Sequence, residues 1–355
     1  MRPSGLRSSV PVAAILLVVL FLSRPLSAQP AQPRSFEATA KDDVTPAAQR
    51  AIDAGLAALA TRQHPDGSFG SGRDYRRNVA VAALSGMAYL SSGSGPDRGP
   101  YGDRVSKTVD FIVASTQPSG FIIREDSAQH GPMYGHGFAT LFLAEVYGLS
   151  PREDVRKSLK SAVQLIVNSQ NKEGGWRYDP DGRDADISVT VCQIMALRAA
   201  RNCGLHVPKT TVDQCTDYVR KSQVADGGFR YQLSGRPTSA FPRTAAGIVA
   251  LYSAGIYEGR DIDRGLDYIR RHEPQGDLAR YDAYYFYGHY YAVQAMWQSG
   301  GDNWKRWYPA IREELLARQL PDGTWSDSLI NPEYATAMAC LILQMPNNYL
   351  PIFQR

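Results

Sequence analysis

The sequence is poor in residues that bind metals or build disulfide frameworks. It has 4 cysteines and 6 histidines among 355 residues. Cys192, Cys203, Cys215 and Cys340 lack the close pairing typical of structural zinc sites. Two interpretations of them stay open: a Cys203–Cys215 disulfide in an oxidising compartment, and buried free thiols.

A large excess of one charge is also absent. The chain has 39 Lys and Arg against 35 Asp and Glu, and three of the arginines lie in residues 1–28, which contain no acid. Without that segment 36 basic residues face 35 acidic ones, a net charge of +1. No basic cluster is interleaved with aromatics. The composition therefore predicts no nucleic-acid partner.

Long hydrophobic runs are missing beyond the N-terminus. The run Val10–Leu22 follows two arginines and precedes the small residues Ser27 and Ala28. It is shorter than the roughly 20 residues that a membrane-spanning helix prefers. We expect residues 1–28 to be a secretory signal peptide, with an uncleaved anchor as the alternative.

This leader implies an exported protein, periplasmic or extracellular, with no membrane span after cleavage. Residues 29–43 are rich in Pro, Ala and Gln, so we expect a flexible segment there. Residues 44–355 are expected to form a single domain. Its oligomeric state is not indicated by the sequence.

The alternating patterns of β-strands are absent outside loops, and a repeated turn is present instead. Its fullest copy is Gln170–Trp176, in which Gly174 and Gly175 precede a tryptophan. The two glycines are expected to supply a positive φ, Gln170 to bond free carbonyls, and Trp176 to cover the turn. Copies begin at Gln63, Gln117, Gln170, Gln223, His272 and Gln319, at separations of 54, 53, 53, 49 and 47 residues.

Each repeat has room for two helices. The first helix is amphipathic, as in residues 151–170, whose apolar side chains keep helical spacing. The second helices are apolar on most sides and rich in Ala and Gly, which predicts a buried inner layer: 78–90, 135–149, 187–200, 244–257, 283–297 and 333–345. Because the last inner helix is as apolar as the others, we expect a closed ring rather than an open solenoid.

The Gln…Gly-Phe/Trp turns, the period near 50 residues and the apolar inner helices resemble the terpenoid cyclase and protein prenyltransferase superfamily. The resemblance covers about Thr45 to Met345. It implies an all-α fold, the (α/α)6 toroid of six helical hairpins.

The resemblance also points to candidate catalytic acids. Squalene and hopene cyclases have a DxDD motif after such a turn, and its middle Asp protonates the isoprenoid. Here the segment reads DADI, so Asp186 matches the proton donor, Asp184 the first Asp, and Ile187 replaces the last. The alternative is that Asp184 or Asp186 caps the helix that begins at Ile187.

Zinc-dependent prenyltransferase activity is not expected. In those enzymes Asp, Cys and His hold the metal, and the corresponding positions here are Asp282, Tyr284 and Ala335. A lone carboxylate does not hold zinc. We therefore expect no metal and no cofactor.

Other candidates for the site come from the loops that enter the inner helices. His130, Tyr134 and His136 flank a glycine-rich helix start, and Tyr281–Trp297 is the most aromatic stretch. Histidine can act as acid or base, and aromatic faces can stabilise carbocations, bind sugars or simply pack. Asp184, Asp186, Tyr134, His136, Arg243 and Tyr285 are expected to converge near one mouth of the ring. The candidate ligand-binding residues are Tyr134, His136, Trp176, Arg243, Asp282, Tyr284 and Tyr285.

Three functions stay open. The first is an isoprenoid-binding toroid, with cyclase or isomerase chemistry at Asp186. The second is a non-catalytic binding or protein-interaction scaffold, and the third is a carbohydrate-active toroid. For Asp186, catalysis predicts a raised pKa through burial, whereas capping alone predicts a lowered one.

Overall fold

The computed structural model describes Glu37 and residues 40–124, 131–274 and 284–354, which belong to one compact unit, 34–355. These residues form twelve α-helices and no strand beyond isolated bridges. The helices are α2 (Pro46–Arg62), α3 (Val79–Ser91), α4 (Gly102–Ala114), α5 (Pro132–Leu149), α6 (Glu153–Asn168), α7 (Ile187–Asn202), α8 (Lys209–Ser222), α9 (Phe241–Ser253), α10 (Arg260–Arg270), α11 (Tyr285–Ser299), α12 (Gly301–Arg318) and α13 (Pro332–Leu343). None of the described helices is both long enough and apolar enough to span a bilayer.

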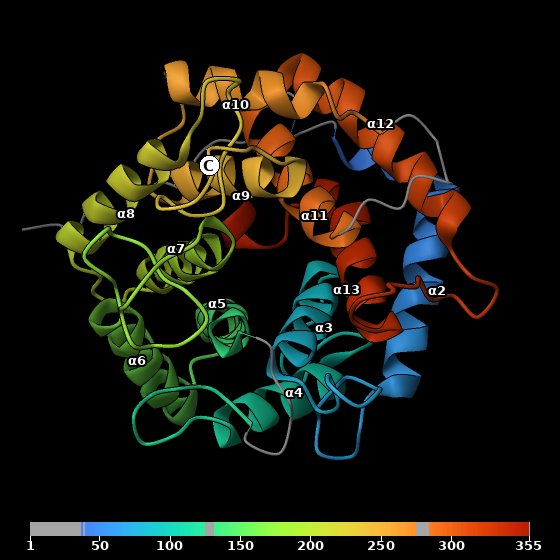
Figure 1. Ribbon diagram of the computed structural model, residues 1–355. Helices are drawn as coiled ribbons and strands as arrows, with labels where there is room; N and C mark the ends of the chain where they lie inside the picture. Colours follow the sequence, from blue (N-terminus) through green and yellow to red (C-terminus); the bar gives the residue numbers. More distant parts are fainter. Residues whose placement is uncertain (1–36, 38–39, 125–130, 275–283, 355) are drawn as a thin grey trace, which may run out of the picture. The chain divides into compact units, whose positions relative to one another are not determined.

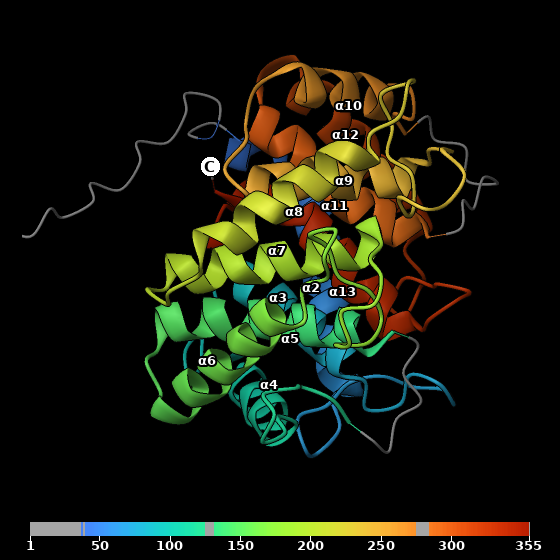
Figure 2. The same cartoon turned by 60° about the vertical axis from the view of Figure 1, so that its left-hand side comes forward.

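The helices form two concentric layers, as predicted (Figure 1). The inner ring runs α3, α5, α7, α9, α11 and α13, and each packs against the next, with α13 returning to α3. The even-numbered helices lie outside. The loops that enter the inner helices gather on one side of the ring (Figure 2). The predicted closed toroid of six hairpins is confirmed.

The glutamines of four turns, Gln63, Gln170, Gln223 and Gln319, join neighbouring hairpins. The Gln170 amide donates to Gly174 O at 2.8 Å within its turn and to Thr211 O at 2.9 Å in the next outer helix, α8. Gln63, Gln223 and Gln319 make the same pair of bonds, reaching Arg104 in α4, Asp261 in α10 and Ala51 in α2 respectively. The repeated glutamine therefore fixes the positions of four outer helices, α2, α4, α8 and α10, relative to the neighbouring turns.

The two glycines of the fullest turn serve different purposes. Gly174 has a φ of 100°, and a Cβ there would lie 2.1 Å from Gln214 O in α8. Gly175 does not have a positive φ; a Cβ there would lie 2.7 Å from the Ala185 Cβ. Only Gly174 thus supplies the predicted backbone conformation, and Gly175 supplies space.

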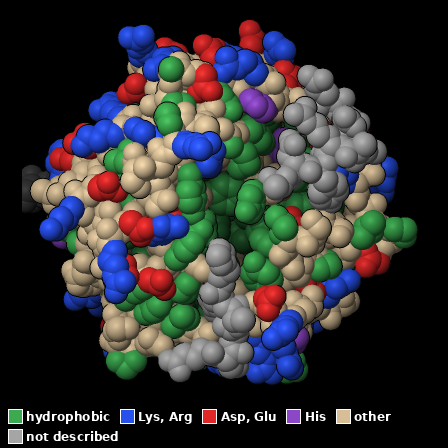
Figure 3. Space-filling model, viewed as in Figure 1, with side chains coloured by type: hydrophobic (Ala, Val, Ile, Leu, Met, Phe, Trp, Pro, Cys, Tyr) green, Lys and Arg blue, Asp and Glu red, His purple; other side chains and the backbone are tan. Residues whose placement is uncertain are grey.

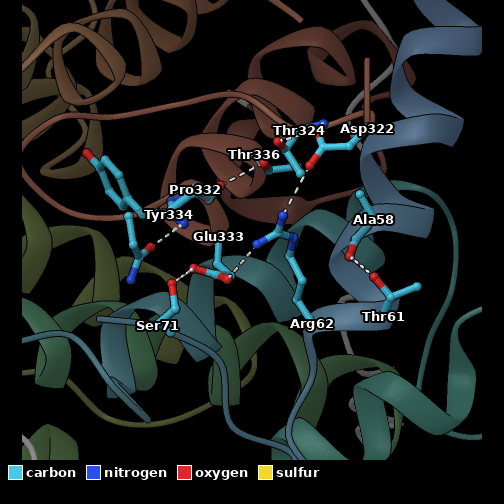
Figure 4. Close-up of polar contacts among 12 residues, drawn as sticks. Ala58, Thr61, Arg62, Ser71, Asp322, Thr324, Pro332, Glu333, Tyr334 and Thr336 are labelled. Carbon is cyan, nitrogen blue, oxygen red and sulfur yellow. Dashed lines mark hydrogen bonds and ion pairs between the residues drawn. The ribbon is translucent and has the colours of Figure 1, made fainter. Parts of the chain in front are cut away.

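The ring closes between the first and last hairpins through polar contacts that Figure 4 shows. Arg62, at the end of α2, bonds to Glu333 Oε1 at 3.2 Å and to Asp322 Oδ2 at 3.2 Å. Ser71 donates to Glu333 Oε2 at 2.8 Å. Glu333 is buried, and the Tyr334 side chain next to it points away from these contacts.

The segment predicted to be flexible ends in an ordered 3-10 helix, Ala40–Asp43. The Asp43 carboxylate accepts a hydrogen bond from Trp304 Nε1 at 2.8 Å, and its carbonyl accepts one from Arg312. Ala40 is buried. The folded unit therefore begins a few residues before the predicted boundary at residue 44.

A short segment closes the inner ring at the end away from the loops. The 3-10 helix Pro351–Phe353 packs on α7, with Ile352 and Phe353 buried. Arg198 of α7 donates to the Gln354 carbonyl, and the Ile352 backbone acts on the Glu145 carboxyl of α5 to lower its pKa. This end of the ring is therefore filled by protein.

Candidate functional site

The candidate site lies on the side of the ring where the loops enter the inner helices. Figure 3 shows a depression near the middle of this face, and the described side chains that border it are mainly hydrophobic. The described residues that bond around Asp186, at the start of α7, come from three inner helices, α5, α7 and α11.

Asp186 caps α7. Its Oδ1 accepts hydrogen bonds from Ser188 N and Val189 N, both at 2.9 Å, and from Ser188 Oγ at 2.5 Å. Asn78 makes the same kind of cap on α3, and Asn331 on α13. The capping interpretation is therefore correct, and this position serves the fold in three of the six hairpins.

The other carboxyl oxygen of Asp186, Oδ2, takes no part in the cap. Asp186 has 0% exposed surface, and Oδ2 accepts no hydrogen bond among the described residues. The nearest cation is Arg177 Nε, 3.7 Å from Oδ2. Burial raises the pKa of Asp186, although Ser188, the α7 amides and Arg177 all act to lower it. The expectation that a capping aspartate would have a lowered pKa is wrong here, because desolvation outweighs the bonds to one oxygen.

Two tyrosine hydroxyl groups bond to Ser188, the residue whose side chain donates a hydrogen bond to Asp186. The Tyr134 hydroxyl, from α5, lies 2.6 Å from Ser188 Oγ. Tyr287, from α11, donates to the Ser188 carbonyl at 2.9 Å. Burial, with Asp186 as a further cause, raises the pKa of both tyrosines well above the usual range. Both therefore remain neutral hydrogen-bonding groups.

A second group of polar residues lies in the loops beside α7. Arg177 bonds to Asp184, and its guanidinium stacks 4.9 Å from the Tyr178 ring centre. The Tyr178 and Tyr231 hydroxyls are 2.6 Å apart. Arg243 lies on the Tyr231 ring at 6.0 Å. Asp184 is half exposed, so its carboxylate is a surface ion-pair partner rather than a buried acid.

Part of the predicted convergence is observed. Asp186 and Tyr134 are linked through Ser188, and Asp184 and Arg243 are joined to the same region through Arg177 and Tyr231. His136 and Tyr285 are placed elsewhere.

His136 lies between α5 and its outer neighbours. Its Nδ1 accepts a hydrogen bond from Ile122 N, and Nε2 lies 3.2 Å from Ala162 O in α6. The ring is completely buried, which lowers its pKa to about 4. Both nitrogens are used by the backbone, so the prediction that His136 binds a ligand is not supported.

Trp176 and Tyr285 also have structural partners. Trp176 is buried in the turn, and its indole donates to Ile166 O at 2.7 Å. The Tyr285 ring packs against His289 and lies under the Arg318 guanidinium at 4.6 Å, toward α12. Both side chains thus join inner to outer helices instead of facing the depression.

The remaining predictions concern the prenyltransferase-like positions. Tyr284 is 62% exposed with a φ of 68°, and Ala335 is buried in α13. Asp282 and His130 lie outside the described residues. Within the described part of the chain, no group of three or more His, Cys, Asp and Glu side chains is arranged to hold a metal ion. The four cysteines, all described, are free.

Several residues of the site were not singled out from the sequence. Arg177 and Tyr178 follow Gly-Gly-Trp, and Arg230 and Tyr231 follow Gly-Gly-Phe one repeat later. This repeated Gly-Gly-aromatic-Arg-Tyr pattern could have revealed the Tyr178–Tyr231 pair. Ser188 has no comparable signal, since a serine in the first turn of a helix is common.

Comparisons with known proteins agree with this architecture. No family model matches the chain. It is 25% identical over 164 residues, 43% of its length, to lanosterol synthase from Candida albicans. It is 25% identical over 186 residues, 52% of its length, to drimenyl diphosphate synthase from Streptomyces showdoensis. These matches span 22% and 32% of the two relatives, so the chain corresponds to a third or less of each.

Solved structures share the fold. The type II terpene cyclase MstE from Scytonema, in complex with merosterolic acid A, has a TM-score of 0.63 at 15% identity, covering 86% of this chain and 99% of that one. The GH76A alpha-1,6-mannanase from Salegentibacter sp. HEL1_6 has a TM-score of 0.60 at 9% identity, covering 85% and 99%. With the sequence matches, these structures confirm the resemblance to the terpenoid cyclase superfamily.

Proposed function

We propose that the chain binds an isoprenoid or similar apolar ligand in the depression, and that Asp186 donates a proton to it. The proposal rests on one observation: the two oxygen atoms of the Asp186 carboxyl group have different bonding. Oδ1 is committed to the helix cap, while the buried Oδ2 is free to carry a proton. Burial raises the pKa of Asp186, which favours the protonated acid.

The surroundings of Asp186 suit this chemistry. The proton would leave Oδ2 for one carbon of a double bond, and the adjacent carbon would become cationic. Asp186 would become a carboxylate, stabilised by Ser188, the α7 amides and Arg177. Tyrosine faces can stabilise the cation until a neighbouring carbon returns a proton to the Asp186 carboxylate, which restores the acid. The overall reaction is an isomerisation or cyclisation.

Access to the acid requires a movement. Asp186 has 0% exposed surface, so a ligand cannot touch Oδ2 in this conformation. Arg177, in the loop that precedes Asp186, is the nearest cation to Oδ2, at 3.7 Å. We propose that displacement of this arginine opens the way to the carboxyl group.

The resemblance to cyclases and the residues at the site favour an isoprenoid over a sugar. Toroid glycosidases share the fold, and glycoside hydrolysis generally uses two carboxyl groups. The second acid here, Asp184, is bound to Arg177 and half exposed. The described side chains that border the depression are mainly hydrophobic, which suits a hydrocarbon chain (Figure 3).

Deuterium incorporation tests the proposal. The protein is incubated in D2O with a panel of linear isoprenoids, and products are analysed by mass spectrometry. We expect products that contain one deuterium per protonation event, and their loss in Asp186→Asn. That variant should fold normally, because Asn78 and Asn331 cap α3 and α13 in the same way. Asp213→Asn, which alters an exposed aspartate of α8, is the matched control.

Two results would contradict the catalytic part. Deuterated product formed equally well by Asp186→Asn would show that Asp186 is not the proton donor. Binding of isoprenoids by the wild-type protein with no product in any incubation would leave a binding scaffold.

Export is part of the proposal. It is supported by the two arginines and the apolar run within residues 1–28. Sequencing the N-terminus of protein recovered from outside the cytoplasm would check it, and a start at Met1 would contradict cleavage.

A further inference from the structure

Tyrosines of α11 reach across the inside of the ring. In the ring order α9 lies between α7 and α11. Even so, Tyr287 donates to Ser188 O at 2.9 Å, and the Tyr291 hydroxyl lies 3.3 Å from Cys192 Sγ, both in α7. These contacts bypass α9, so the two side chains cross the interior.

Near Tyr291, the deeper of these two residues, side chains fill the axis of the ring. The helices α5 and α11 stand opposite each other in the ring of six. Their residues Phe138 and Tyr290 nevertheless meet edge to face, with ring centres 6.3 Å apart. Tyr290 in turn contacts Phe353 of the closing segment at 6.4 Å. Side chains from opposite walls thus close the interior from this level to the far end.

The crossing residues form two levels along α11. Tyr287 is the third residue of the helix, and Tyr291 follows one turn later, about 6 Å deeper at 1.5 Å per residue. Tyr290 and Tyr291 have 0% exposed surface, whereas Tyr287 is only partly buried. Of the crossing side chains described, Tyr287 is therefore the one nearest the loop side, and Tyr290 and Tyr291 lie one turn beneath it.

We infer that Tyr287 sets the depth of the depression and so limits the length of the isoprenoid chain that the protein accepts. The inference rests on the proposed function. A short chain fits above the Tyr287 ring, whereas a longer one needs the volume that this ring occupies. Removing the ring would lower the floor to Tyr291, about one helical turn, which is comparable to one isoprene unit.

The test measures binding of a series of isoprenoid alcohols, geraniol, farnesol and geranylgeraniol, by fluorescence titration. For the wild-type protein, we expect the weakest binding with the longest alcohol. In Tyr287→Ala the ratio of Kd values should move by about tenfold or more toward the longer alcohols, because a filled apolar pocket discriminates by that amount. Tyr287→Phe keeps the ring and loses only the bond to Ser188, so its preference should match the wild type. Tyr287→Leu should give a smaller shift and serves if the alanine variant does not fold.

The outcomes separate the inference from the proposed function. Binding by wild type and by the alanine or leucine variant with the same length preference would overturn the role of Tyr287 and leave the proposed function standing. A shifted preference in Tyr287→Phe would overturn it too, since the hydroxyl and not the ring would then be responsible. If no alcohol binds to any of these folded proteins, the proposed function fails and the inference fails with it.

Discussion

Glu145 is a buried acid at the closed end of the ring, and it links pH to stability. The side chain is 4% exposed, and burial raises its pKa to about 8, against the lowering effects of Ile352 N and Arg198. The unfolded chain ionises near the usual value of 4.5, while the folded protein keeps the proton until about pH 8. The contribution of Glu145 to stability is therefore greatest below pH 4.5 and is lost as the pH rises to about 8.

Glu145→Gln should remove this dependence. The amide has nearly the same shape as the carboxyl group and cannot ionise. Since one pKa unit is worth about 1.4 kcal/mol, the wild type should lose a few kcal/mol more than the variant between pH 5 and pH 8. Urea unfolding at several pH values measures this, with the exposed Glu153→Gln as control. Parallel pH profiles for wild type and Glu145→Gln would refute the assignment.

At the scale of single residues, the sequence predicted the position of Asp186. It did not predict which way the side chains of the neighbouring helix α5 point. His136 stands at a helix start, as predicted, and points outward to Ile122 and Ala162. Because α5 is apolar on most sides, its sequence does not indicate which face turns to the ring axis. The link from Asp186 through Ser188 to Tyr134 depends on that rotation and could not be predicted.

Among the elements, the turns before the inner helices are the most constrained. Gly174 and Gly182 both have positive φ values, 100° and 65°. A Cβ on Gly174 would lie 2.1 Å from the Gln214 carbonyl oxygen, whereas one on Gly182 would have 3.5 Å to its nearest neighbour. The two positions therefore separate backbone strain from a clash with the next hairpin.

Gly174→Ala should lower the free energy of unfolding by more than about 3 kcal/mol, because α8 must move. Gly182→Ala should cost only about 1 kcal/mol, the usual cost of a left-handed alanine. Chemical denaturation of both variants gives the comparison. Equal losses at the two sites would mean that the contact with α8 does not restrain the turn.

The turns were also the elements that the sequence predicted best. Gln170 was expected to bond free carbonyls, and it bonds Gly174 and Thr211. Such a prediction succeeds because the turn is local and recurs in phase. The contact of Tyr287 with α7 joins residues 99 apart in the sequence, so no local pattern indicates it.

For the whole molecule, closure of the ring depends on the junction of the first and last hairpins. Gln319 bonds to Ala51 O as Gln170 bonds to Thr211 O, and Arg62 neutralises the buried Glu333. An open array of hairpins would have two ends with a single neighbour each. In the closed ring every hairpin has two neighbours, so we expect the ring to unfold in one transition.

Arg62→Met should destabilise the protein by about 3 kcal/mol, because it leaves the Glu333 charge buried without its partner. The double variant Arg62→Met, Glu333→Gln should recover much of that loss. Denaturation followed by circular dichroism and tryptophan fluorescence measures both effects. The exposed pair Glu153–Arg156 is the control, and Arg156→Met should change stability by less than about 1 kcal/mol. A loss as large in the double variant as in Arg62→Met would show that the charge is not the cause.

The shared cap of the inner helices has a genetic consequence. Three inner helices are capped through a side-chain oxygen, that of Asn78, Asp186 or Asn331. The second polar atom of the group is an amide nitrogen in the asparagines and a carboxyl oxygen in the aspartate. Asparagine and aspartate codons differ by a single nucleotide. A lineage with this fold can therefore gain or lose an acid at the mouth of the ring by one mutation, while selection on folding alone maintains the position in the meantime.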